Sequence, residues 1–141
     1  MRHRPDQTID NLRNVPLFAE CTNRELTKIA ALHCRVHVKA GKAVAEQGTV
    51  GREFIVIVSG TATVQRDGLD IATLGAGDYF GEIALIAHGR RTATVIAATD
   101  LVVDAFSRAE FDQLLEASPE LAPRIYAEAT RRMHGTAAGK Q

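Results

Sequence analysis

The sequence predicts a mainly β domain, either a sandwich or a jelly-roll barrel, with helices at both ends. Hydrophobic residues are spaced as in helices near both ends of the chain and alternate with a period of two between them. Glycines interrupt the middle segment at short intervals, as they do where many short strands are joined by tight turns. The 141 residues, 45% of them hydrophobic and 24% charged, are enough for one domain with its own core.

The N-terminal third is predicted to be helical. Thr22 and Glu25 form a capping box, in which each side chain accepts a hydrogen bond from the other residue's backbone N–H. Apolar residues follow at helical spacing, which predicts a helix over about 23–33. Upstream, the apolar residues of 12–18 indicate a short helix and a turn around Pro16.

The alternating part of the chain runs from residue 35 to residue 106. Asp67-Gly68 is expected to turn a hairpin, because glycine accepts the positive φ that such a turn requires. Further turns are expected at glycines that bound the apolar runs. Strands are predicted at 35–38, 43–45, 53–58, 61–65, 71–74, 92–98 and 101–106, with one more ending at Phe80.

A second capping box, Ser107 and Glu110, marks the return to helix. Phe106 and Phe111 flank it at the spacing of a hydrophobic staple, which stabilises the entry of the chain into a helix. A helix is therefore expected from this box to about Ala117.

A last helix is expected with Ser118 as its cap and Pro119 at its first position. Pro123 lies slightly too deep for that start, which predicts a kink or a later beginning. The tail over 135–141 is expected to fray. The apolar stripe of this helix consists of Leu121, Ile125, Ala129 and Met133.

Charge and cysteine usage exclude several classes of function. Lys+Arg and Asp+Glu both number 17, which argues against a chain that binds nucleic acid or an anionic membrane. Cys21 and Cys34 lack metal-ligand spacing and are expected to be buried, reduced thiols. Neither a signal peptide nor a stretch of membrane-spanning length is apparent, so the cytoplasm is the expected location.

The segment 81–95, GEIALIAHGRRTATV, carries the functional signal. Gly81 permits a tight turn, and residues 82–86 can form one helical turn whose first N–H groups suit an anion, above all phosphate. Arg91 opens the following strand and can place its guanidinium over the same anion. The Glu82 carboxylate suits a hydroxyl such as a ribose 2′-OH. Together with the apolar enclosure, these features describe a pocket for a nucleotide monophosphate.

This segment resembles the phosphate-binding cassette of the cyclic nucleotide-binding domain family. The resemblance extends over roughly residues 12 to 134 and implies an eight-stranded antiparallel jelly-roll barrel (a double-stranded β-helix) with N- and C-terminal helices. It also implies a cyclic nucleotide ligand, cAMP by preference and cGMP as a second possibility. The matching stretches are TNRELTKIA, EFIVIVSGTATV, LGAGDYFGE, FGEIAL with RRTATV, and AEFDQLLEASPELA.

The resemblance also assigns roles by position. Glu82 would take the ribose 2′-hydroxyl and Arg91 the cyclic phosphate. Many members of the family have proline where this chain has Arg90, which we expect to be a solvated side chain. The other implied binding residues lie in the same cassette: Gly81, Ile83, Ala84 and Thr92.

The C-terminal helix is implied to cover the base as a lid. Arg132 and Met133 are the candidate lid residues. The alternative is that this helix packs permanently on the core. Movement of the helix would pass the signal out of the pocket.

Three alternatives remain open at this stage. The pair Glu82–Arg91 can be a structural ion pair without a ligand. A ligand-free interaction domain can keep the same fold. A cupin-like metal enzyme would need several metal ligands on neighbouring strands, and only His37 lies convincingly in one. We therefore expect no catalytic residues, no metal and no cofactor apart from the nucleotide.

The expected organisation is a single cyclic nucleotide-binding domain over 1–141. Within the chain we see no nucleic-acid-binding unit and no membrane segment, so the expected partner is an effector protein or a fused effector domain. The chain is expected to be either a stand-alone sensor or a regulatory domain of a larger protein. The expected parts are helices over 8–34, the barrel over 35–106 with its cassette at 80–94, helices over 107–134 and the tail at 135–141.

Overall fold

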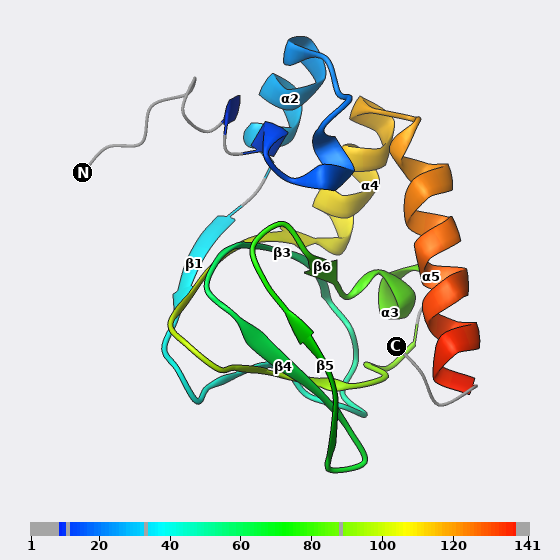
Figure 1. The fold of residues 1–141 in the computed structure, drawn as a ribbon. Coiled ribbons are helices and arrows are strands. Elements are labelled where there is room, and N and C mark those ends of the chain that lie inside the picture. Colours follow the sequence, from blue (N-terminus) through cyan, green and yellow to red (C-terminus); the bar gives the residue numbers. More distant parts are fainter. Residues whose placement is uncertain (1–8, 11, 33, 88, 138–141) are drawn as a thin grey trace.

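Eight short strands form the body of the molecule, with helices at one end and along one side (Figure 1). The computed structural model describes residues 9–10, 12–32, 34–87 and 89–137. The strands are β1 (Cys34–Val38), β2 (Ala43–Ala45), β3 (Glu53–Ser59), β4 (Ala62–Arg66), β5 (Leu69–Leu74), β6 (Tyr79–Phe80), β7 (Thr94–Ala97) and β8 (Leu101–Ser107).

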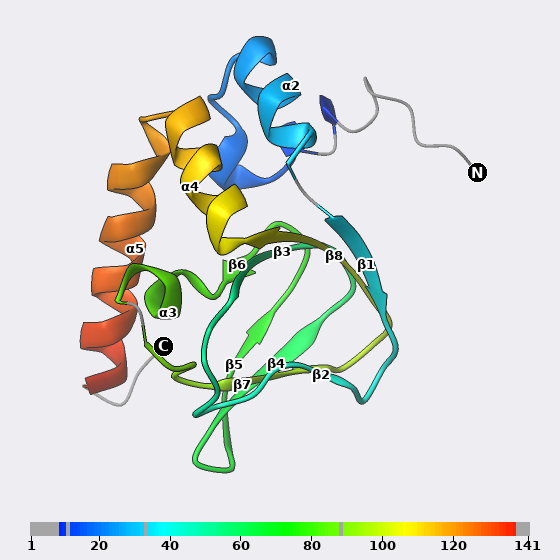
Figure 2. The same cartoon turned by 180° about the vertical axis from the view of Figure 1, so that it is seen from behind.

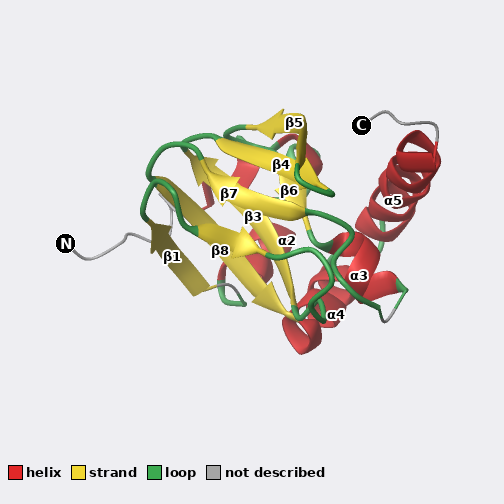
Figure 3. Ribbon diagram, turned by 90° about the horizontal axis from the view of Figure 1, so that it is seen from below, coloured by secondary structure: helices red, strands yellow, loops and turns green. Residues whose placement is uncertain are grey.

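The strands pair into two four-stranded antiparallel sheets. One sheet has the order β1-β8-β3-β6 and the other β2-β7-β4-β5. Strands from distant parts of the chain therefore lie side by side, and the chain crosses repeatedly between the sheets (Figure 3). This arrangement confirms the predicted jelly-roll barrel with flanking helices.

Strand β3 is buried on both faces, which explains its unbroken apolar run. Phe54 and Val56 belong to the core beneath the helices. Ile55 and Ile57 alternate with them and belong to the core between the sheets. Because successive side chains of a strand point to opposite faces, this one strand joins the two cores.

The helices cover one end of the barrel (Figure 2). Both predicted capping boxes are formed: Glu25 N–H donates to Thr22 Oγ1 at 3.1 Å, and Glu110 N–H donates to Ser107 Oγ at 3.2 Å. Helix α2 ends three residues earlier than predicted. The helical elements are η1 (Pro16–Phe18), α2 (Asn23–Ala30), the short α3 (Glu82–Ile86), α4 (Arg108–Ala117) and α5 (Leu121–Ala137).

The predicted start of the last helix is wrong. Ser118 is the C-cap of α4, and a turn at residues 119–120 separates it from α5, which begins at Leu121. Pro123 then falls in the first turn of α5, where backbone N–H groups have no intrahelical acceptor and a proline removes no hydrogen bond. The later start that Pro123 suggested is therefore confirmed.

Three further expectations need correction. Helix α5 continues through Gly135 to Ala137, because a glycine costs a helix only about 1 kcal/mol and need not end it. Strand β7 begins at Thr94, since residues 92–93 form a bend. Cys21 is buried as expected, but Cys34 is exposed on β1, an edge strand. None of the described helices is long and apolar enough to cross a membrane.

Candidate functional site

A pocket opens between the second sheet, α3 and α5. The space within it, including the solvent at its open mouth, amounts to about 630 Å³. Apolar side chains from the strands form part of its wall, among them Val64, Leu74 and Val95. Three arginines, Arg66, Arg91 and Arg132, also line it, together with the carboxylate of Glu82.

Gly81 is the residue on which the entry to α3 depends. Its φ of 98° and ψ of −7° lie in the left-handed region, which glycine adopts without steric cost. A Cβ at this position would lie 2.4 Å from the carbonyl oxygen of Glu53 and 2.6 Å from Arg91 Nη1. Only glycine therefore lets the backbone approach both groups.

A loop over residues 48–51 fixes the backbone around Arg91. Arg91 N–H donates to Thr49 O at 2.7 Å, and Gly48 N–H donates to Arg91 O at 2.9 Å. A Cβ on Gly51 would lie 2.2 Å from the Cβ of Ala84 on α3. No local sequence pattern marks this contact between Gly51 and the cassette, because the two segments are more than 30 residues apart.

The side chain of Arg91 reaches into the pocket, and its Nη1 is buried with no hydrogen-bond partner in the described part of the chain. Burial lowers the pKa of Arg91, while the charges of Glu53 and Glu82 act in the opposite direction. A buried donor without an acceptor is costly. An anion with oxygen acceptors, such as a phosphate, fits this position.

Arg90 differs from its neighbour. It is exposed, and its Nη1 donates to Gly48 O at 2.8 Å outside the pocket lining. The expectation of a solvated side chain is therefore confirmed, with the addition of this hydrogen bond.

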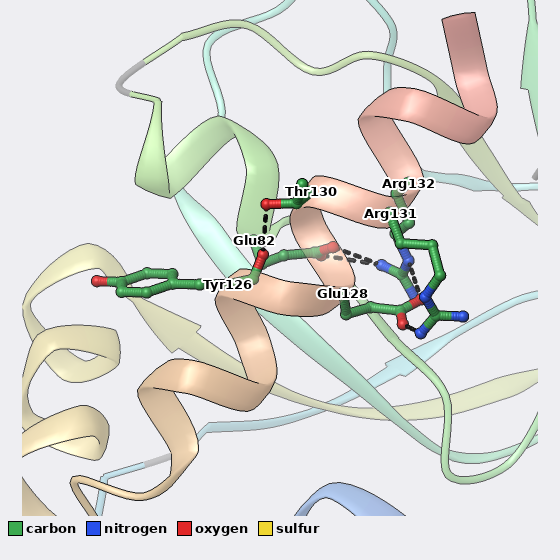
Figure 4. Close-up of polar contacts among 6 residues, drawn as sticks. All are labelled: Glu82, Tyr126, Glu128, Thr130, Arg131 and Arg132. Atoms are coloured by element: carbon green, nitrogen blue, oxygen red, sulfur yellow. Dashed lines mark hydrogen bonds and ion pairs between the residues drawn. The ribbon is translucent and has the colours of Figure 1, made fainter. Parts of the chain in front are cut away.

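Glu82 is 1% exposed, and its carboxylate is bound by the last helix (Figure 4). Arg132 Nη1 donates to both carboxylate oxygens, at 2.9 and 2.8 Å. Arg132 is itself held by Glu128, which accepts from its Nε at 2.9 Å, and by the ring of Tyr79, whose centroid lies 4.9 Å from the guanidinium carbon. Burial raises the pKa of Glu82, and Arg132 opposes that shift.

The considered ion pair between Glu82 and Arg91 is not formed among the described residues. The partner of Glu82 is Arg132, which we had expected only as a lid residue. Helical periodicity identifies the face of α5 that packs inward, but it does not identify the residue across the pocket. The two charged groups of the cassette therefore differ: Glu82 has an internal partner and Arg91 Nη1 has none.

The remaining predicted residues also lie at the pocket. Gly81, Ile83, Ala84 and Thr92 all line it. The side chain of Met133 lies outside the described residues. Within the described part of the chain, no group of three or more His, Cys, Asp or Glu side chains is placed to hold a metal ion.

Comparison with known proteins identifies the family. The family model described as the cyclic nucleotide-binding domain matches residues 35–118. The chain belongs to this family. The match spans the barrel strands from Arg35 onward, the cassette and α4.

Relatives of the domain occur inside larger proteins. The chain is 38% identical over 122 residues to a cyclic nucleotide-gated potassium channel of Rhizobium etli, covering 86% of this chain and 34% of the channel. It is 39% identical over 105 residues to a cAMP-dependent protein kinase regulatory subunit of Schizosaccharomyces pombe, covering 74% of this chain and 26% of that protein. The chain thus spans about a third or less of these relatives.

Solved structures share the fold. One described as Sp-2Cl-cAMPS bound to PKAR CBD2 superposes with a TM-score of 0.83 at 25% identity, covering 97% of this chain and 92% of that one. The similarity extends over nearly the whole of both chains, so the two chains share the fold.

The unpartnered Nη1 of Arg91 predicts that this residue destabilises the ligand-free protein. We expect Arg91→Met, which keeps most of the apolar stem, to raise the free energy of unfolding by about 1 kcal/mol, since an unsatisfied buried donor costs about 1–3 kcal/mol. Denaturant unfolding without ligand measures this change. Arg90→Met is the matched control and should change little, and a less stable Arg91→Met would contradict the prediction.

The burial of Glu82 predicts a pH-dependent stability. In the folded state, burial raises the pKa of Glu82 above its ordinary value of 4.5. The folded protein therefore keeps the carboxyl proton of Glu82 at pH values where the unfolded chain has released it. The stabilisation is present below the unfolded value and is lost as the pH rises through the folded value. We expect the free energy of unfolding, relative to Glu82→Gln, to fall as the pH is raised from below 4.5. A difference that grows with pH would show that Arg132 outweighs burial.

Proposed function

We propose that this chain binds a cyclic nucleotide, cAMP by preference and cGMP as a second ligand, in the pocket beside α3. The observation that carries the proposal is the buried Nη1 of Arg91, which has no hydrogen-bond partner among the described residues and reaches the same pocket as Glu82. We propose a non-catalytic, regulatory role for the whole of 1–141 as one binding domain.

The roles of the residues follow from their chemistry. Arg91 is always charged and presents donors in a planar fork, which suits the two free oxygens of a cyclic phosphate. The first turn of α3 adds backbone N–H groups next to Gly81, so Gly81, Ile83 and Ala84 line the same anion. Thr92 follows Arg91 directly, and its proposed position is near the phosphate and the base.

Glu82 keeps hydrogen-bond acceptor capacity beyond its two contacts with Arg132. A carboxylate offers about four lone-pair positions, and Arg132 Nη1 occupies one on each oxygen. The carboxylate of Glu82 can therefore accept a hydrogen bond from a ribose 2′-hydroxyl as well as from Arg132.

The matched proteins support this ligand and a regulatory role. Their descriptions name a cyclic nucleotide-gated channel, a cAMP-dependent kinase regulatory subunit and a domain with bound Sp-2Cl-cAMPS. The proposed partner is accordingly an effector protein or a fused effector domain. The identity of that effector lies outside this chain.

Helix α5 is the proposed route by which the signal leaves the pocket. Its far end holds Glu82 through Arg132. Nearer its start, Arg124 donates to Leu17 O at 3.4 Å and to Glu20 at 2.5 Å, which connects α5 to the N-terminal helices. A ligand at Glu82 thus acts on a helix that contacts both the pocket and the other end of the molecule.

A ligand-free interaction domain is the second candidate, and one observation favours it. The Glu82–Arg132 pair gives the buried carboxylate a partner without any nucleotide. The two candidates differ in whether Arg91 finds an acceptor, so a direct binding measurement decides between them.

Binding should depend on Arg91 and not on Arg90. We expect calorimetry to show saturable binding of both nucleotides, with cAMP at least as tight as cGMP. Arg91→Ala should weaken it by roughly 30-fold to several thousandfold, because removing one member of a buried charged contact costs about 2–5 kcal/mol. Arg90→Ala should bind as the wild type does. Absence of binding to the wild type would favour the interaction domain, and the reverse ranking of the two variants would reassign the phosphate site.

Ligand should protect the end of α5 more than its start. Leu121 and Ile125 are already 1% and 0% exposed, so hydrogen exchange there should change little on adding cAMP. Protection over residues 126–137 should rise, because Arg132 gains a bound ligand beside Glu82. Arg132→Ala should abolish the rise, and Arg131→Ala, whose side chain is 76% exposed, should keep it. Equal protection with and without cAMP in the wild type would exclude the lid and leave a permanently packed helix.

A further inference from the structure

Arg66 is a pocket residue that no sequence motif marks. It is the last residue of β4, and Ala62 and Val64 of the same strand belong to the core between the sheets. Side chains two residues apart share a face of a strand. Arg66 therefore continues an inward-facing row, and it lines the pocket together with Val64.

The side chain of Arg66 is oriented by the cassette. Its Nε donates to the carbonyl oxygen of Thr92 at 2.9 Å. The ion pairs of the described residues do not include it, and it is half-buried. The two Nη groups of a guanidinium held through Nε remain available as donors in a fixed plane.

Arg66 and Arg91 are held by different parts of the cassette. Arg91 Nη1 lies against Gly81, where a Cβ would come within 2.6 Å of it. Arg66 is instead bound to the bend at residues 92–93, beyond the phosphate arginine in the chain. For a ligand whose phosphate lies at Gly81 and Arg91, we assign the base to the side of the pocket at Arg66.

We propose that Arg66 is a specificity-determining residue that donates to the base edge and favours guanine; this inference rests on the proposed cyclic-nucleotide function. Guanine presents two adjacent acceptors, O6 and N7, which suit a guanidinium. Adenine presents N7 beside an amino group that donates, and Arg66 has no acceptor to offer it. Arg66 thus raises the affinity for cGMP relative to cAMP, so the two nucleotides bind with more similar affinities than they would without it.

The test compares three nucleotides on the wild type and on Arg66→Ala, with calorimetry of the full chain. Inosine 3′,5′-cyclic monophosphate keeps O6 and N7 of guanine but lacks the 2-amino group, a donor that the hydroxyl of Thr92 is able to accept from. Its affinity therefore reports on O6 and N7, the atoms proposed to bind Arg66. We expect Arg66→Ala to weaken cGMP and the inosine nucleotide by the same factor, roughly tenfold, and cAMP by less than about threefold.

Two variants serve as controls. Arg90→Ala removes an exposed arginine that also donates to a backbone carbonyl, at Gly48, and should leave all three affinities unchanged. Arg66→Lys keeps the charge but not the planar fork, so it should fold as the wild type and still lose most of the guanine preference. Thermal unfolding of each variant checks the fold.

The remaining outcomes separate the two hypotheses. Equal weakening of all three nucleotides would make Arg66 a second phosphate contact and overturn the inference. Loss of cGMP affinity without loss of the inosine nucleotide would assign the effect to the 2-amino group and overturn it as well. Unchanged affinities of Arg66→Ala for all three nucleotides would overturn this inference but would not contradict the proposed function. A wild type that binds none of the nucleotides would refute the proposed function itself, and this inference with it.

Discussion

The carboxylate of Glu82 is the point at which the barrel, α3 and α5 depend on one another. Removing an ionised carboxylate from water costs several kcal/mol unless a partner compensates for it, and Glu82 is 1% exposed. Its partner, Arg132, lies 50 residues further along the chain. The last turns of α5 are therefore positioned by a charge in the pocket, and Glu128 and Tyr79 hold Arg132 in the orientation that this pairing requires.

Arg91 presents the opposite situation. Its backbone is fixed by the loop over 48–51. A side chain at Gly51 or Gly81 would collide with neighbouring atoms, so glycine at both positions allows the close packing around Arg91. Yet its Nη1 has no partner in the described part of the chain. Folding has already removed this donor from water, so an arriving anion gains a hydrogen bond without that desolvation cost and with little loss of side-chain freedom.

Much of the fold is predictable because its signals are local. Capping boxes at Thr22 and Ser107, the turn at Asp67-Gly68 and the period-two runs each depend on neighbouring residues, and each appears where expected. The cassette is predictable for the same reason. The Glu82–Arg132 pair is not, because periodicity identifies a helix face and cannot identify a contact across 50 residues.

The structure differs from the sequence prediction at two other places, Ser118 and Arg66, and in both the cause is a contact with a distant part of the chain. Ser118 and Pro119 carry the local pattern of a helix start, but Ser118 is used as the C-cap of α4, and its hydroxyl lies 3.7 Å from Cys21 Sγ in the buried interface with the N-terminal segment. Arg66 was passed over because a charged residue at the end of a strand is usually exposed. Counting two positions from Val64 would have placed it on the inner face.

Helix α5 is held by apolar packing in its first half and by the contacts of Arg132 near its end. This difference determines which part of the helix a ligand can affect. Leu121, Ile125 and Ala129 are buried to 3% exposure or less, and that apolar burial does not involve the pocket. Beyond them, Arg132 attaches the helix to Glu82 of α3 and to the ring of Tyr79 on β6. A ligand that binds Glu82 alters the contacts of Arg132 and leaves the apolar burial of Leu121, Ile125 and Ala129 unchanged. A ligand-dependent change in α5 therefore begins at its C-terminal end. The first half of the helix, where Arg124 contacts Leu17 and Glu20, connects that change to the N-terminal helices.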